Sequence, residues 1–197
     1  DRLARYLERF GATPSIHEVH AKHHRITDLP PGTSVAHDVA TSNNSLAFLW
    51  GKGHIEKVAS DLVHLKPGML VAALHAELNY DDQRKALHAV PPEDGKAVLA
   101  TNCAQTSLTF PDLERVVISG YVRHETLDEE GIRSLVIRDI SRAVYLQQRG
   151  RVGRTQEGTC VYHGAPLEEL AAEVPAETQH ASLEEPILRL LAAGKIH

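Results

Sequence analysis

The stretch Gln147-Gln148-Arg149-Gly150-Arg151-Val152-Gly153-Arg154 holds three arginines and two glycines within eight residues. A guanidinium group can hydrogen-bond two phosphate oxygens at once, and a glycine lets the backbone come close to a ligand. We therefore expect the stretch to bind a polyphosphate. Alone, the same run could also be a basic turn that only faces solvent, so the interpretation depends on its neighbours.

Short apolar runs alternate with amphipathic stretches along the chain, as in a parallel sheet whose strands are joined by helices. Five buried strands are predicted from these runs: Ser45–Trp50, Met69–Leu74, Ala97–Thr101, Arg115–Ser119 and Thr159–His163. The pattern therefore predicts an α/β fold with a mostly parallel central sheet.

Two helices are predicted among these strands, one between the first and second strand and one between the second and third. Apolar residues recur at helical spacing after Gly51 until Pro67-Gly68 ends the segment. A second helix begins at Asn79 or Asp81 and continues through Ala89, before two prolines.

A hairpin-like excursion and a third helix lead to the arginine stretch. Gly131 marks a polar turn before the strand Ser134–Arg138, and Ser141 can cap the helix that follows. This helix delivers the arginines at its C-terminal end, where the helix dipole favours positive charge.

Size and charge limit what the chain can be. It has 197 residues, 42% of them hydrophobic, which is enough for one sizeable core but not for two complete domains. A net charge of -5 argues against binding nucleic acid by bulk charge. Any polyanion must therefore be bound by a local basic patch, and the arginine stretch is the evident candidate.

Cysteine content and hydropathy indicate a compartment. Only Cys103 and Cys160 occur, which fits two reduced thiols better than a disulfide framework or a zinc site. No apolar run approaches the ~20 residues that span a bilayer, and no signal-peptide stretch begins the chain. We expect a soluble protein of the cytoplasm, with the nucleus or a viral replication complex as open alternatives.

Several motifs connect these features to a known family. The spacing Q-x-x-G-R-x-G-R in residues 147–154 resembles motif VI of superfamily 2 helicases, and Ala100–Thr109 (ATNCAQTSLT) resembles motif V of their DEAH/DExH-box branch. Phe48-Leu49-Trp50-Gly51 with Ile55-Glu56 resembles motif IV. The resemblance implies a second RecA-like domain, which is a three-layer sandwich. The compact motif VI is also similar to that of RNA-virus helicases.

The resemblance implies roles for particular residues around ATP. Gln147 would orient the hydrolytic water, Arg154 would be the arginine finger on the γ-phosphate, and Arg151 would contact the same phosphates. Such arginines stabilise the charge that develops during phosphoryl transfer. Further ATP contacts are implied at Ser107, Thr109 and Gly150.

The resemblance also implies contacts to the backbone of a single nucleic-acid strand, at Gly51, Thr101 and Asn102. Backbone contacts carry no base sequence and so permit movement along any strand. The family favours RNA and movement from 3′ to 5′, although backbone contacts by themselves do not separate RNA from DNA.

Neither a G-x-x-x-x-G-K-[ST] phosphate loop nor a D-E-x-H box is found in the sequence. ATP and Mg²⁺ are therefore expected to be bound mainly by a first RecA-like domain, which would be the partner of this one, and the chain alone is not expected to hydrolyse ATP. Residues 1–14 resemble the end of that first domain and the hinge, 15–166 the second RecA-like domain, and 167–197 the start of a winged-helix-like domain.

Three departures from the family pattern bear on the nucleotide contacts. Gln148 stands where many relatives have a second basic residue, although Arg149 beside it could replace that residue. Gln105 replaces a glutamate that is usual in motif V, and Pro111 stands where an acidic ribose contact is expected.

Other residues that could carry chemistry have structural interpretations. His17, His20, His23 and His24 lack the paired spacing of a zinc site, so we expect surface histidines and no metal. Trp50, the only tryptophan, could stack on a base, but its place at the end of an apolar strand favours core packing.

Two alternatives to a helicase stay open at the level of sequence. A helicase-derived module without catalytic activity could bind RNA or a protein. A nuclease or a chromatin-remodelling translocase could use the same motor without separating strands. A degenerate phosphate loop in the preceding domain would favour the first alternative, and failure to displace strands would favour the second.

Overall fold

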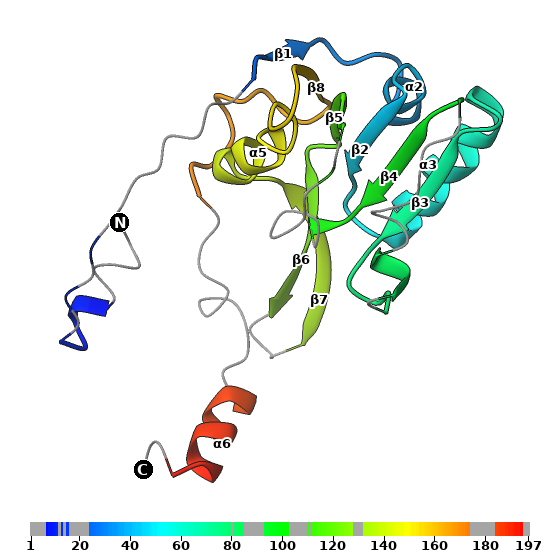
Figure 1. The fold of residues 1–197 in the computed structure, drawn as a ribbon. Coiled ribbons are helices and arrows are strands. Elements are labelled where there is room, and N and C mark those ends of the chain that lie inside the picture. Colours follow the sequence, from blue (N-terminus) through cyan, green and yellow to red (C-terminus); the bar gives the residue numbers. More distant parts are fainter. Residues whose placement is uncertain are drawn as a thin grey trace.

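The computed structural model describes residues 7–11, 13, 15, 24–79, 81–84, 93–102, 110, 112–127, 132–173 and 184–194. In this part of the chain, six strands form a sheet in the order β1-β8-β5-β2-β4-β3, and every neighbouring pair is parallel (Figure 1). The strands are β1 (Ile26–Leu29), β2 (Asn44–Phe48), β3 (Leu70–Leu74), β4 (Lys96–Ala100), β5 (Arg115–Ile118) and β8 (Gly158–Tyr162). The predicted parallel sheet is confirmed.

All strands of this sheet except β1 match predicted strands to within two residues at each end. β1 lies at the edge of the sheet, and its two middle residues, Thr27 and Asp28, are exposed. An edge strand of four residues with a polar centre has no apolar run, so the sequence pattern does not predict it.

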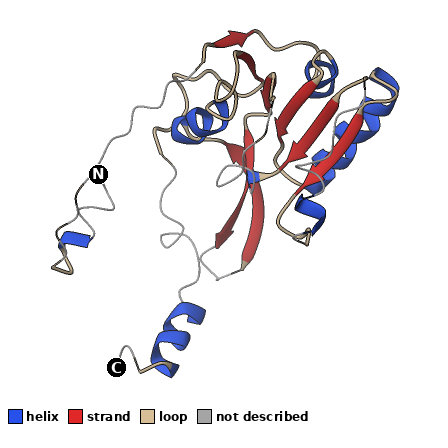
Figure 2. Cartoon of the chain, viewed as in Figure 1, coloured by secondary structure: helices blue, strands red, loops and turns tan. Residues whose placement is uncertain are grey.

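Helices cover both faces of the sheet (Figure 2). α2 (Val35–Ala40) and α3 (Lys52–Leu65) pack on one face, and α5 (Arg142–Arg149) packs on the other. A further helix, α6 (Glu184–Ala192), comes near the end of the chain. The sheet between two layers of helices is the predicted three-layer, RecA-like sandwich.

The predicted helix starts are confirmed by their caps. Ser141 Oγ accepts a hydrogen bond from the backbone N–H of Val144 at 3.3 Å. Asn79 Oδ1 accepts one from the backbone N–H of Asp82 at 2.8 Å. The predicted continuation of that second helix through Ala89 lies outside the described residues.

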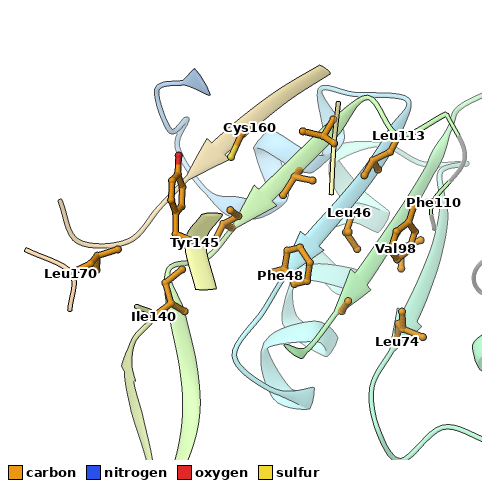
Figure 3. Packing of buried hydrophobic residues seen from close by; sticks show 14 residues of the cluster. Leu46, Phe48, Leu74, Val98, Phe110, Leu113, Ile140, Tyr145, Cys160 and Leu170 are labelled. Carbon is orange, nitrogen blue, oxygen red and sulfur yellow. The ribbon is translucent and has the colours of Figure 1, made fainter. Parts of the chain in front are cut away.

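Alternate residues of the central strands pack on opposite faces of the sheet. Figure 3 shows Leu46, Phe48 and Val98 in the cluster that Tyr145 of α5 joins. The intervening residues, such as Leu99, pack with α2 and α3 on the other face. Because both faces are covered, these strands are continuous apolar runs, which is why the sequence predicts them well.

An antiparallel hairpin projects from the sheet (Figure 1). It consists of β6 (Tyr121–Leu127) and β7 (Arg133–Asp139), so the predicted strand Ser134–Arg138 is confirmed. Ile140 N–H closes the base of the hairpin by donating to the Gly120 carbonyl at 2.9 Å. The hairpin therefore starts directly where β5 ends.

The chain stays on the same core for some residues after β8. Leu170 is 5% exposed and belongs to the cluster under α5. The Arg142 N–H donates to the Ala171 carbonyl at 2.8 Å. The first residues after 166 therefore pack on the domain that precedes them.

No helix among the described residues is both long enough and apolar enough to cross a membrane.

We expect Leu46→Ala to lower the free energy of unfolding by about 2–5 kcal/mol, because Leu46 is fully buried and its removal leaves a cavity. Urea unfolding of the 197-residue chain measures the loss. Leu65→Ala, at a position that is 49% exposed, is the matched control and should cost less than about 1 kcal/mol. Equal losses for the two variants would contradict this core.

Candidate functional site

Burial alternates along the arginine stretch, which spans the end of α5 and the loop before β8. Gln147 and Arg154 are exposed, whereas Gln148 is 1% exposed and Arg151 is 6% exposed. The stretch therefore alternates between buried and exposed side chains, and Gln147 and Arg154 are exposed enough to reach a ligand.

Arg149 connects α5 to the edge strand β1. Its Nε donates to Asp28 Oδ1 at 2.8 Å, and its Nη2 donates to Asp28 Oδ2 at 2.7 Å. The Tyr145 hydroxyl adds a longer hydrogen bond to Asp28 Oδ1 at 3.4 Å. Two parallel hydrogen bonds between a guanidinium and a carboxylate fix both distance and orientation. Arg149 therefore anchors the end of α5.

The pair shifts the ionisation of its own groups. The hydrogen bonds from Arg149 hold the pKa of the Asp28 carboxyl below its ordinary value. Asp28 in turn raises the pKa of the Arg149 guanidinium. The sequence suggests that Arg149 could replace a basic phosphate ligand missing at position 148. In the structure this guanidinium is engaged with Asp28 instead.

Gly153 holds the loop against the residues before β1. Its φ is +78°, in the left-handed region that favours glycine. Its carbonyl accepts a hydrogen bond from the His24 N–H at 2.8 Å. A Cβ at this position would lie 2.6 Å from Ile26 Cγ1, which is too close for any side chain. The loop can therefore approach β1 only with a glycine here.

Arg154 extends from this anchored loop into solvent. Its Nε donates to the Gly150 carbonyl at 3.0 Å, which orients the guanidinium while the residue stays exposed. Burial, and then the positive charge of Arg154, lower the pKa of the Arg151 guanidinium. An arginine remains charged at neutral pH even so. The loop thus carries two neighbouring cations, which suits a ligand with several negative charges.

The residues expected to contact nucleic acid lie at the carboxyl edge of the sheet. Gly51 comes soon after β2 and Thr101 comes directly after β4, and these two strands are parallel neighbours. Thr101 N–H donates to the Leu74 carbonyl at 3.0 Å, which holds it to the end of β3. Asn102 is exposed beside it.

The arginine loop, which is residues 150–157 between α5 and β8, lies at the amino edge of the sheet, opposite the carboxyl edge. Its Gly153 carbonyl accepts a hydrogen bond from the His24 N–H, just before β1. At its other end, Gly158 begins β8, and the Gly158 N–H donates to the Arg25 carbonyl at 3.1 Å. The amino ends of β1 and β8 are therefore its neighbours. The predicted site residues form two groups, one with Gln147, Gly150, Arg151 and Arg154 and one with Gly51, Thr101 and Asn102. Ser107 and Thr109 lie outside the described residues.

Trp50 differs from the sequence-based prediction of core packing. β2 ends at Phe48, and Trp50 is only partly buried and belongs to neither core cluster. The indole stacks on His54 of α3, with ring centroids 5.3 Å apart. The apolar run continues for two residues after the strand itself ends. Residue types alone therefore overestimate the strand.

Arg123 of β6 is a neighbour of this region that sequence reasoning missed. Its Cζ lies 5.5 Å from the centre of the Trp50 ring. A Cβ at Gly51 would lie 3.5 Å from the same Cζ, so the guanidinium covers this buried glycine. No local motif links Arg123 to Gly51, because the hairpin brings them together only in the folded chain.

Cysteine and histidine show no sign of a reactive site in the described part of the chain. Burial raises the pKa of the Cys160 thiol to about 12, which keeps it protonated. No group of three or more His, Cys, Asp or Glu among the described residues could hold a metal ion. Cys103, His17, His20 and His23 lie outside those residues.

A family model described as the helicase conserved C-terminal domain matches residues 31–156. The chain belongs to this family. The matched segment begins before α2 and ends in the arginine loop, so it contains both groups of site residues.

Curated relatives of this helicase C-terminal domain are RNA helicases by name. ATP-dependent RNA helicase DHX33 of Mus musculus is 32% identical over 165 residues, which cover 79% of this chain and 24% of the relative. ATP-dependent RNA helicase HrpB of Escherichia coli is 33% identical over 157 residues, covering 78% of this chain and 19% of HrpB. The chain thus spans about a quarter or less of these relatives.

Solved structures agree with this assignment. The crystal structure of the E. coli DExH-box NTPase HrpB matches with a TM-score of 0.79 and 31% identity, covering 98% of this chain and 26% of that one. A second crystal structure, of the Escherichia coli DEAH/RHA helicase HrpB, matches with a TM-score of 0.81 and 29% identity over 98% and 26%. The resemblance to the second RecA-like domain of DEAH/DExH-box helicases is therefore confirmed.

We expect Asp28→Asn to cost up to about 1 kcal/mol of stability at pH 7, because it removes one charge of an ion pair that is partly exposed. The folded pKa of Asp28 lies below its unfolded value of about 3.9, so this stabilisation is present above that pH. It is lost as the pH falls through the folded pKa. Urea unfolding of both proteins from pH 7 to pH 2.5 measures the difference.

Glu77→Gln is the matched control for this pair, since Glu77 contacts Lys52 at 3.4 Å and both side chains are more than half exposed. It should leave stability almost unchanged at every pH. A wild-type advantage over Asp28→Asn that stays constant down to the lowest pH would show that ionisation of Asp28 is not its source.

We expect Gly153→Ala to cost at least about 1–2 kcal/mol, because alanine resists the left-handed backbone and its Cβ would also collide with Ile26. Gly53→Ala in α3 is the control, since a Cβ there meets nothing within 4 Å and alanine is favoured in a helix by about 1 kcal/mol. Thermal unfolding should move in opposite directions. A neutral Gly153→Ala would mean that the loop is not held as described.

Proposed function

We propose that this domain is the second motor domain of an ATP-dependent RNA helicase that moves from 3′ to 5′, with Arg154 as its arginine finger. The observation that carries the proposal is an exposed Arg154 on a loop that Arg149 and Gly153 hold against the edge strand. A finger acts best when it is charged, accessible and already in place, because little reorganisation is then needed during the reaction.

ATP would be bound between this domain and a first RecA-like domain that supplies the phosphate loop and the ligands of Mg²⁺. When bound, ATP supplies the phosphoryl group that is transferred to water. Arg154, with Arg151 behind it, would stabilise the negative charge that develops on that group. Gln147 is exposed on α5, where its amide can orient the attacking water.

The RNA contacts would come from the opposite edge of the sheet. The Thr101 hydroxyl, the Asn102 amide and backbone N–H groups at the start of α3 are suited to phosphate and sugar oxygens. The curated relatives are RNA helicases by name, which supports RNA as the strand that is bound.

Coupling between the two sites would follow from the rigidity of the sheet. Its central strands are buried on both faces, so the domain moves as one body. Closure of the ATP cleft at the arginine edge would then displace the RNA contacts at the carboxyl edge, and hydrolysis would reverse the displacement. A cycle of closing and opening would move the domain along the strand.

We expect Arg154→Ala to lower RNA-stimulated ATP hydrolysis about 10³-fold or more in a protein that joins this domain to its first RecA-like domain, by the magnitude usual for arginine fingers. Steady-state phosphate release with and without single-stranded RNA measures the effect. Arg84→Ala, an exposed arginine outside the motifs, is the control and should retain wild-type turnover.

Near-normal turnover of Arg154→Ala would contradict the finger assignment. A wild-type protein that binds RNA but hydrolyses no ATP would instead support the noncatalytic module. ATP hydrolysis without displacement of strands from duplexes with 3′ or 5′ overhangs would support a translocase that does not unwind.

A further inference from the structure

Trp50 stands at the point where the sheet, α3 and the hairpin meet. It follows β2, directly precedes the Gly51 cap of α3, and contacts Arg123 of β6. Neither the ATP contacts nor the RNA contacts proposed above use it.

The indole takes part in two ring contacts from different parts of the chain. The His54 imidazole stacks on it at 5.3 Å with an angle of 25° between the planes. This partner is local, since Trp50 lies two residues before α3 begins at Lys52 and His54 lies in the first turn of that helix. The Arg123 guanidinium lies 5.5 Å from the indole centre and comes from the hairpin, far along the sequence. Trp50 therefore connects the hairpin to the helix.

The charges of the three groups allow this arrangement. Burial, and then the positive charge of Lys57, lower the pKa of His54, so its imidazole is neutral at pH 7 and does not repel Arg123. A guanidinium over an indole face is attracted by the negative face of the ring, and tryptophan is the best partner among the aromatic residues. The contact is thus a favourable cation–π interaction.

Among the described residues, the other side chains on this side of the hairpin are exposed. Tyr121, Leu135 and Ile137 share the Arg123 face of the hairpin by their register, and all three are substantially exposed. Arg123 is thus the side chain of this face with a described contact to the loop before α3, at Trp50 and Gly51. Loss of the contact would remove this attachment of the hairpin to the loop before α3.

We propose that Trp50 is a positioning residue that holds the β6–β7 hairpin at a fixed angle to the carboxyl edge of the sheet, through the stack of Arg123, Trp50 and His54. The hairpin starts from the same edge at which RNA contacts are proposed. The angle of the hairpin relative to Gly51 would therefore decide how the bound strand passes along the hairpin. This consequence rests on the proposed function.

Hydrogen exchange in the 197-residue chain tests the stack without any helicase assay. Arg123→Ala and Trp50→Ala should each speed exchange of the β6 and β7 amides about two- to fivefold, as expected for loss of one exposed cation–π contact. Trp50→Phe should have a smaller effect, because a weaker aromatic partner remains. Arg138→Ala, an exposed arginine of β7 in the opposite side-chain register, is the matched control and should change nothing.

Trp50 is the only tryptophan, so its fluorescence reports on the stack directly. In Arg123→Ala the emission should shift to longer wavelength and acrylamide should quench it more strongly. If Trp50→Ala fails to fold, Arg123→Ala still decides, since it removes only an exposed side chain. Hairpin exchange and fluorescence that are unchanged in Arg123→Ala would overturn the proposal.

A coupling measurement in the two-domain protein separates positioning from general stability. Arg123→Ala should open fewer base pairs per ATP hydrolysed, while kcat for RNA-stimulated hydrolysis stays at the wild-type value. Equal losses in both would overturn a positioning role. Weaker RNA binding of Trp50→Ala with unchanged hairpin exchange would instead identify Trp50 as a base-stacking residue. A wild-type protein without ATPase activity would refute the proposed function. Hydrogen exchange of the β6 and β7 amides would still test the stack in that case.

Discussion

The burial of the sheet on both faces is the constraint on which the rest of this domain depends. β2, β4 and β5 carry fully buried apolar residues on alternate sides, with α5 over one face and α2 and α3 over the other. Such a sheet is close-packed and does not bend easily. It therefore provides a rigid body, and each of its two edges carries one group of the predicted site residues.

Separate local contacts then fix the side chains at each edge. At the arginine edge, the Asp28–Arg149 pair and the left-handed Gly153 hold the loop so that Arg154 is exposed and Gln148 is buried. At the carboxyl edge, the stack on Trp50 holds the hairpin near Gly51. Residues that look alike in the motif thus have different tasks. Arg149 anchors the loop, whereas Arg154 is free to reach a ligand.

Much of the fold was predictable because its signal is local or periodic. Strands buried on both faces are apolar runs, and helix starts such as Ser141 carry a capping side chain. Prediction failed where the signal is short or depends on partners. β1 is an edge strand with a polar centre, α2 has only six residues, and Trp50 continues an apolar run past the end of its strand. The candidate site residues are motif residues, but their separation at two edges is not visible in the motif.

The sequence by itself determined the fold class and the helicase family, and it supplied the candidate residues at each edge, because periodicity and motif spacing are properties of neighbouring residues. Only the tertiary structure decided which arginine is an anchor and which is exposed, that Arg123 covers Gly51, and that the arginine loop and Thr101 lie at opposite edges. These depend on contacts between residues far apart in the chain. Burial and partners of a side chain come into existence only when the sheet assembles.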